Sequence, residues 1–193
     1  MANLLDIARR RPLSIAARLL TILIVLPTLA VAQDADQRRL RPAVGVHLGY
    51  ASIDKAKGSL EVGAFADVGS YRYERLRMIV GVDYLSSTST RPNADGEFSD
   101  LTLSGDLRWK PFAVRSVAPF VAVGLGLHFR NNDASDPDIA DIYDGLAVGY
   151  NLSLGSMIDF TPDGRTGAVV DLRRVAAQNV SRSSFRVGAF YRF

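Results

Sequence analysis

Two histidines and a set of acidic and basic side chains are the candidate reactive groups of this sequence. His47 and His128 are its only histidines, and both fall on the charged side of extended segments. The charged residues on that side are Glu61, Asp67, Arg77, Asp83, Asp106, Arg108, Lys110, Asp171, Arg173, Arg186 and Arg192. Five are acids and six are bases, and buried charges persist only when they are paired. The pattern favours a structural side-chain network, and a proton or ion path is the alternative.

A metal or thiolate centre is not predicted. The chain has no cysteine, which excludes disulfides and thiolate chemistry. His47 and His128 fall in the first and fifth extended segments, on opposite sides of a closed sheet, and no His-x-x-His spacing of a zinc site is present. The acids of residues 131–144 lack the spacing of an EF-hand, so cation binding there is only an alternative to a solvated loop. We expect no cofactor and no metal.

Eight segments with a period of two would position the charged side chains. They cover about 43–51, 59–68, 76–85, 99–110, 119–129, 146–160, 166–175 and 184–193. Turn residues fill the gaps, and the one short helix candidate, residues 137–143, lies in a gap. Outer connections are expected at 52–58, 86–98, 130–145 and 176–183, and inner ones at 69–75, 111–118 and 161–165.

Alternation alone does not say which face is inside, because a soluble barrel buries its apolar face and a transmembrane barrel buries its polar face. The fifth segment discriminates between the two. Its polar side is Phe120, Ala122, Gly124, Gly126 and His128, without a charge. That side would be a poor water-facing surface. It suits a narrow interior, where glycine leaves room for long side chains from other strands.

Aromatic residues fall near the two ends of the segments. Trp109, Phe160, Tyr191 and Phe193 fall near one end, and Tyr50, Tyr84, Phe129 and Phe185 near the other. Residues 121–129 would extend about 30 Å along a strand, or roughly 23 Å of height when tilted by ~40°, close to the ~25 Å apolar band of an outer-membrane barrel. We predict an all-β fold: an eight-stranded antiparallel up-and-down transmembrane β-barrel, preceded by a cleaved signal peptide.

Residues 1–32 are interpreted as a secretory signal peptide. Four arginines precede an apolar run that closes on Ala30-Val31-Ala32. The run is shorter than the ~20 residues of a spanning helix and contains Pro27. Residues 33–42 are a short polar lead-in, and 43–193 form the barrel. Cleavage would lower the net charge from +3 to zero, because the signal holds four Arg and one Asp. We therefore expect no nucleic-acid partner.

The last segment alternates apolar and aromatic residues up to the final residue. These are Phe185, Val187, Ala189, Tyr191 and Phe193. With the signal, the eight segments and the aromatic bands, residues 43–193 resemble the small outer-membrane β-barrels of Gram-negative bacteria, of the OmpA/OmpX type. The resemblance implies an outer-membrane location, both termini in the periplasm, contact with lipid and lipopolysaccharide, and a C-terminal signature read by the barrel-assembly machinery. No peptidoglycan-binding domain is expected after the barrel.

Lipid A deacylases of the outer membrane give the enzymatic alternative a specific form. These eight-stranded barrels use a His-x-Ser motif, and the similar stretch here is His128-Phe129-Arg130. Arginine stands where the nucleophilic serine should be, and a nucleophile must lie within hydrogen-bond reach of its base. We expect no catalytic residue. The expected function is structural or a surface interaction with an envelope or host partner, with a closed lumen. A small-solute channel and a lipid A-modifying enzyme are the alternatives.

Overall fold

The computed structural model describes residues 41–54, 56–70, 73, 75–88, 97–113, 116–132, 145–178 and 180–193. The predicted signal peptide, the lead-in up to residue 40, the helix candidate 137–143 and residues 133–144 of the acidic segment lie outside the described residues. Within the described residues, no helix is long and apolar enough to cross a membrane.

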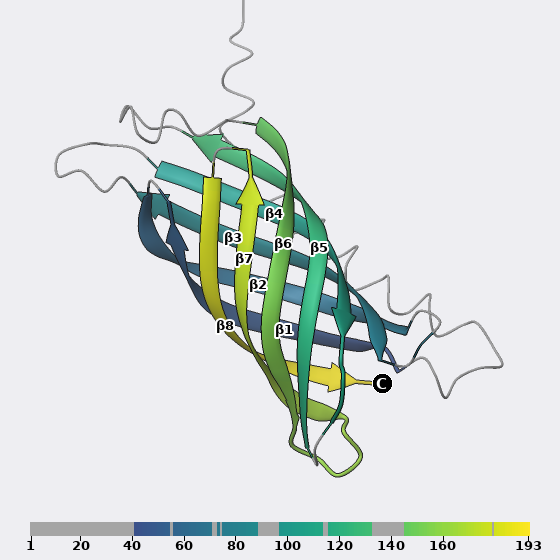
Figure 1. Ribbon diagram of the computed structural model, residues 1–193. Coiled ribbons are helices and arrows are strands. Elements are labelled where there is room, and N and C mark those ends of the chain that lie inside the picture. The colour runs from purple at the N-terminus through teal and green to yellow at the C-terminus, as the bar shows by residue number, and fades with distance from the viewer. Residues whose placement is uncertain are drawn as a thin grey trace, which may run out of the picture. The chain divides into compact units, whose positions relative to one another are not determined.

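Eight antiparallel strands form one closed barrel, in which every strand pairs with its neighbours along the chain (Figure 1). The strands are β1 (Ala43–Ile53), β2 (Ala56–Ser70), β3 (Leu76–Thr88), β4 (Glu97–Trp109), β5 (Val117–Asn132), β6 (Gly145–Asp159), β7 (Thr166–Ala177) and β8 (Val180–Arg192). The first and last strands close the barrel, with Val44 opposite Tyr191 and Tyr50 opposite Phe185. Closure leaves no unpaired strand edge, which a sheet in lipid requires.

Two of the outer connections are much shorter than the sequence predicted. β1 reaches Ile53 and β2 begins at Ala56, so most of 52–58 belongs to strands. β7 reaches Ala177 and β8 begins at Val180, so most of 176–183 does too. The reason is that Ile53, Ala56 and Val180 turn inward into a buried apolar cluster, which continues the ladder. The other connections agree with the prediction within three residues.

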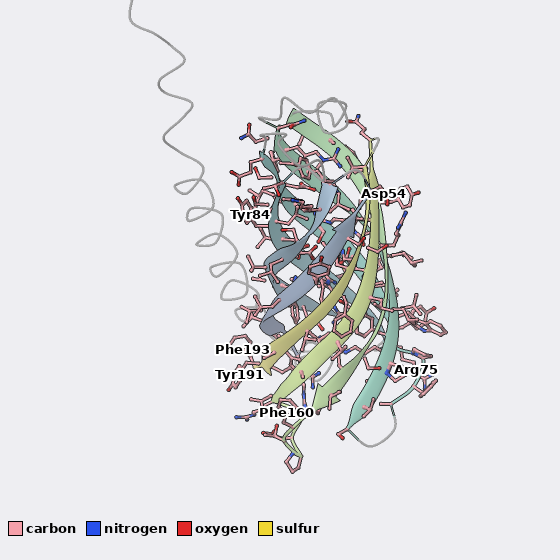
Figure 2. The ribbon with its side chains drawn as sticks, turned by 90° about the vertical axis from the view of Figure 1, so that its left-hand side faces the viewer. Asp54, Arg75, Tyr84, Phe160, Tyr191 and Phe193 are labelled. Carbon is pink, nitrogen blue, oxygen red and sulfur yellow. The ribbon has the colours of Figure 1, made fainter. Side chains whose placement is uncertain are left out.

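The outer face of the barrel is apolar. Leu48 and Leu125 are each 66% exposed there, and Tyr150 is 65% exposed. A continuous exposed apolar surface of this kind is the lipid-facing belt of a transmembrane barrel. Figure 2 shows Tyr84 towards the end that carries Asp54, and Phe160, Tyr191 and Phe193 towards the opposite end. We call the end with Phe193 the terminal end and the end with Asp54 the far end.

Two apolar clusters lie inside the barrel, one towards each end. The far cluster is Ala51, Ile53, Ala56, Leu85, Phe98 and Val180. The near cluster, which lies towards the terminal end, is Phe65, Ile79, Phe120, Ala122, Met157, Val169 and Phe190. The sequence predicted an interior filled by charge, whereas the lumen is filled by charge between two apolar layers. The far cluster was not predicted because Ile53, Phe98 and Val180 lie at or beyond the predicted segment ends, whereas the residues of the near cluster lie within predicted segments, on the charged side.

Lumen-facing glycines make room for the long charged side chains. A Cβ at Gly63 would lie 2.5 Å from both Asp83 Oδ1 and His47 Nε2. A Cβ at Gly124 would lie 2.4 Å from the carbonyl oxygen of Gly105. Gly105 itself is exposed on the outer face, where a Cβ would meet nothing within 4 Å. In the Val62-Gly63 and Val123-Gly124 pairs, the valine therefore lies exposed on the outer face and the glycine occupies an inner position that admits no side chain.

Candidate functional site

The lumen is where the fold gathers the charged residues. Of the eleven that share the charged side of the sequence, nine are buried: Glu61, Asp67, Arg77, Asp83, Asp106, Arg108, Asp171, Arg173 and Arg186. Lys110 and Arg192 are half-buried towards the terminal end. All eight strands supply lumen-facing side chains, because each strand points alternate residues inward. The resulting contacts join residues that are far apart in the sequence.

Arg186 is the centre of this network. Its Nε and Nη2 donate to the two carboxylate oxygens of Asp171, at 2.8 and 2.6 Å. Its Nη1 lies 3.5 Å from Asp83 Oδ1 and 3.8 Å from Glu61 Oε1. One guanidinium on β8 therefore faces carboxylates of β2, β3 and β7. A guanidinium that donates two hydrogen bonds to the same carboxylate, as Arg186 does to Asp171, makes one of the stronger charge-assisted contacts.

His47, Glu61 and Asp83 form the one group of described residues with the composition of a metal site. One ligand atom from each lies within 4.8 Å of the others. His47 Nε2 is 2.6 Å from Asp83 Oδ1, and both carboxylates already face Arg186. Because the guanidinium supplies the positive charge that a metal would bring, the geometry fits an internal ion-pair cluster better than a metal centre.

A second cluster towards the far end was missing from the predicted network. It consists of Asp100, Thr102, His128, Arg130 and Arg182. His128 Nδ1 lies 3.0 Å from Asp100 Oδ2, and Arg182 Nη1 donates to the same oxygen at 3.2 Å. Arg182 Nε also lies 3.7 Å from Glu61, which links this cluster to Arg186. Strict alternation could have identified Asp100 and Arg182 as lumen-facing, because each lies an even number of residues before Asp106 or Arg186 on the same strand.

Arg108 and Arg173 occupy the part of the lumen next to the near cluster. Arg173 Nη1 donates to Asp106 Oδ2 at 2.8 Å. The Arg108 guanidinium lies over the Phe120 ring, 4.2 Å from its centroid, and Nη1 lies 3.5 Å from the sulfur of Met157. No carboxylate of the described residues lies within ion-pair distance of Arg108. A cation over an aromatic face gains part of the stabilisation that an ion pair would give.

The terminal end of the lumen carries a separate set of charges. Arg77 pairs with Asp67 at 2.6 Å, and Arg192 lies 3.4 Å from Asp159. Lys110 follows the last residue of β4 and makes no ion pair within the described part of the chain. Burial lowers the pKa of the Lys110 ammonium to about 7, against the opposing attraction of Asp67. This lysine is therefore partly neutral near physiological pH.

The His128-Phe129-Arg130 stretch has no catalytic geometry. Phe129 points to the outer face and is 43% exposed. Arg130 points into the lumen, where its guanidinium donates to the carbonyl oxygens of Ala177 and Gln178 at 2.9 and 3.1 Å. The hydroxyl that contacts His128 within the described residues is that of Thr102, 3.0 Å from Nδ1. The arginine therefore ties β5 to the β7–β8 connection and leaves the serine position without a nucleophile.

A closed antiparallel barrel with an apolar outer face and a charged, packed lumen is a transmembrane β-barrel of the outer-membrane class. Residues 21–193 match the family of the outer membrane protein beta-barrel domain, and the chain belongs to this family. The family implies a location in the outer membrane. No curated protein matches the chain.

Several solved structures are similar to this barrel. Neisserial surface protein A (NspA) has 17% identity over 79% of this chain and 97% of its own, with a TM-score of 0.58. Ail, the attachment invasion locus protein of Yersinia pestis, has 11% identity over 79% and 97%, with a TM-score of 0.52. The outer membrane enzyme PagL has 13% identity over 76% and 98%, with a TM-score of 0.55. At these sequence identities, the likeness to the three structures shows a shared fold and nothing beyond it.

Proposed function

We propose that this chain is a sealed outer-membrane barrel with a structural or surface-interaction role in the bacterial envelope. The observation that carries the proposal is the layer of buried charged side chains that fills the lumen between the far and near clusters. Most guanidinium groups of this layer face carboxylates. Steady ion flow needs a continuous hydrated path with sites that bind only weakly. Buried ion pairs between two apolar layers are a poor path of this kind. The outer belt and the far-end connections are then the surfaces left for function.

Conductance measurements test the sealed lumen directly. The barrel, refolded and inserted into planar bilayers, should show no steady conductance. A stable, voltage-independent conductance would replace this proposal with the small-solute channel. A variant with Leu85→Ala and Phe98→Ala thins the far cluster and leaves the ion pairs in place, so it should stay closed. Conductance in that variant alone would place the barrier at the far cluster.

We also propose that the chain is not an enzyme, although PagL shares its fold. The position that the nucleophilic serine would occupy supports this proposal, because it holds Arg130, whose guanidinium is anchored to backbone carbonyl oxygens. Purified barrel incubated with lipid A should release no acyl chain, as measured by mass spectrometry. Arg130→Ser restores the spacing of the His-x-Ser motif and should remain inactive, because His128 stays turned into the lumen. Acyl release by the unaltered chain would support the enzyme instead.

Orientation and surface contacts follow from the same proposal. We place the terminal end in the periplasm and the far end at the cell surface, with lipid and lipopolysaccharide around the apolar belt. Two proteins of similar structure, Neisserial surface protein A and the attachment invasion locus protein of Yersinia pestis, support a role at the cell surface with an envelope or host partner. Protease accessibility of the far-end connections on intact cells tests the orientation, and protection there would contradict it.

Export is proposed to remove residues 1–32. N-terminal sequencing of protein extracted from the outer membrane should begin at Gln33. A chain that still begins at Met1 would rule out cleavage.

The last strand is proposed to be read by the assembly machinery through Phe185, Val187, Ala189, Tyr191 and Phe193. Phe193 also packs edge-on against Tyr191, with ring centroids 5.3 Å apart, and its amide donates to Pro42 O at 3.0 Å. Deleting Phe193 should cost about 1–3 kcal/mol of aromatic burial in vitro. In cells it should greatly reduce outer-membrane abundance. Normal abundance would leave Phe193 as a packing residue only.

A further inference from the structure

A small polar cavity lies inside the barrel, where the ion-pair network meets the near cluster. Its volume is about 20 Å³, which is room for about one water-sized ligand. The wall includes the charged or polar residues His47, Asp83, Ser104, Asp106, Arg108, Asp171, Arg173 and Arg186. Phe65, Ile79 and Val169 close it towards the near cluster. The cavity is therefore separated from the terminal end by apolar side chains.

Four residues of this wall carry buried polar atoms that no protein group satisfies. The unsatisfied atoms are Ser104 Oγ, Asp106 Oδ1, Arg108 Nε, and Arg173 Nε and Nη2. All four residues are at most 8% exposed. A buried polar group without a hydrogen-bond partner destabilises the fold, and more so when it is charged. Such a concentration of unsatisfied atoms around one polar cavity points to a bound ligand.

The chemistry of the wall restricts what the ligand can be. The volume excludes a phosphate or a carboxylate-bearing molecule. The guanidinium groups of Arg108, Arg173 and Arg186 balance the three carboxylates of the wall, so no net negative charge is left to attract a metal cation. The charged wall disfavours an apolar guest. Three of the five unsatisfied atoms are N–H donors, and the Ser104 hydroxyl can donate as well, so the ligand must above all accept hydrogen bonds.

We propose that this cavity is a binding site for one compact hydrogen-bond acceptor, a water molecule or a chloride ion, held by Arg108 and Arg173. Asp106 Oδ1 needs a donor, which water would supply. Arg108 has no carboxylate within ion-pair distance in the described part of the chain, and chloride would give it a direct anionic contact. Either ligand connects Arg108 to the Arg173–Asp106 pair. The proposal goes beyond a sealed lumen, because a sealed lumen needs no bound ligand.

High-resolution crystal structures of the barrel, prepared in sodium chloride and in sodium bromide, test the proposal. One density peak should lie within hydrogen-bond distance of Arg108 Nε or of Arg173 Nη2. An anomalous bromide signal at that peak identifies the halide, and an oxygen-like peak without the signal identifies water. Absence of a peak, or a peak that touches neither arginine, overturns the proposal.

Two variants tie the peak to this wall. Arg108→Met keeps much of the side-chain length but removes Nε and the charge, so the peak should be lost. Ser104→Val fills the cavity without changing the charge and should also remove the peak, which covers the case in which Arg108→Met does not fold. Arg174→Met, an exposed arginine away from the cavity, should keep it. An unchanged peak in Ser104→Val would overturn the proposal.

A solution measurement distinguishes the two ligands. Refolding should be carried out in chloride and in gluconate at equal ionic strength, because the closed lumen limits exchange after folding. A chloride ligand should raise the unfolding midpoint in chloride relative to gluconate, since a ligand bound only by the folded state stabilises it. A water ligand predicts equal midpoints in the two salts. The conductance test is independent of both results, so failure here leaves the sealed lumen standing.

Discussion

At the scale of single residues, the lumen depends on positions that carry no side chain. Gly124 lies beside Asp106 and the backbone of Gly105, so there is no space for even a methyl group. Gly63 allows Asp83 and His47 to approach each other. Gly105 has open space on the outer face. The same residue type therefore has opposite consequences on the two faces of one sheet.

Substitution by alanine should separate these two kinds of glycine. Gly124→Ala should destabilise the barrel by about 1–3 kcal/mol, because the contacted atoms include backbone that must shift. Gly105→Ala should be neutral or stabilising by up to about 1 kcal/mol, because it reduces the freedom of the unfolded chain. Urea unfolding in lipid vesicles measures both. Equal destabilisation by the two variants would mean that the faces are assigned wrongly.

Lys110 should make the stability of the barrel depend on pH. Its pKa is lowered to about 7 by burial, so between pH 7 and its ordinary pKa the unfolded chain binds more protons. The free energy of unfolding should therefore rise with pH in this window, by at most about 1.4 kcal/mol per pH unit. Lys110→Met should flatten that slope. An unchanged slope in the variant would show that Lys110 is charged in the folded barrel.

At the scale of the strands, alternation sets which side chains meet lipid. Leu125 on β5 lies on the outer face, opposite Gly105 of β4 and Tyr150 of β6. Ser52 on β1 lies on the same face but beyond Tyr50, near the far rim. The cost of a charge on this face should therefore depend on its depth along the strand.

An arginine scan at these two positions tests the depth. Leu125→Arg should cost about 2–4 kcal/mol, as expected near the bilayer midplane, whereas Ser52→Arg should cost about 0–1 kcal/mol near the interface. Refolding into lipid vesicles, followed by urea unfolding, gives both values. If Ser52→Arg were the more damaging variant, the apolar belt would have to lie nearer the far end.

At the scale of the whole molecule, ion pairs connect strands across the lumen. Arg186 faces Asp171, Asp83 and Glu61, and Arg182 continues the network to Asp100. Asp83 is shared between His47 on β1 and Arg186 on β8, and Asp100 is shared between His128 on β5 and Arg182 on β8. Removing Arg186 would leave Asp171 without a cationic partner among the described residues and would take one partner each from Asp83 and Glu61.

Arg186→Met should destabilise the barrel by about 3–5 kcal/mol, because breaking a buried pair leaves uncompensated charge. Arg174→Met is the matched control. Arg174 pairs at 3.6 Å with Asp54 at the surface, where both side chains are more than half exposed, and such pairs contribute about 0–1 kcal/mol. Denaturant midpoints in vesicles give the comparison. A small loss for Arg186→Met would mean that water reaches the network.

The class of fold and the direction in which most side chains point could be predicted from the amino-acid sequence. A period of two, turn residues between segments and two aromatic bands are local signals, so they predicted eight strands and the charged lumen face. The same parity placed Glu61, Asp83 and Arg186 inside without any knowledge of their partners.

Which charged groups meet, and which side chains close the lumen, became known from the folded barrel. Contacts such as Arg186 with Asp83 or Arg182 with Asp100 depend on the stagger between strands, which alternation does not contain. The far cluster was missed because Ile53, Phe98 and Val180 lie at or beyond the predicted strand ends, where turn propensity competes with pairing. Burial against the opposite wall favours the strand there, and that wall exists only once the barrel is closed.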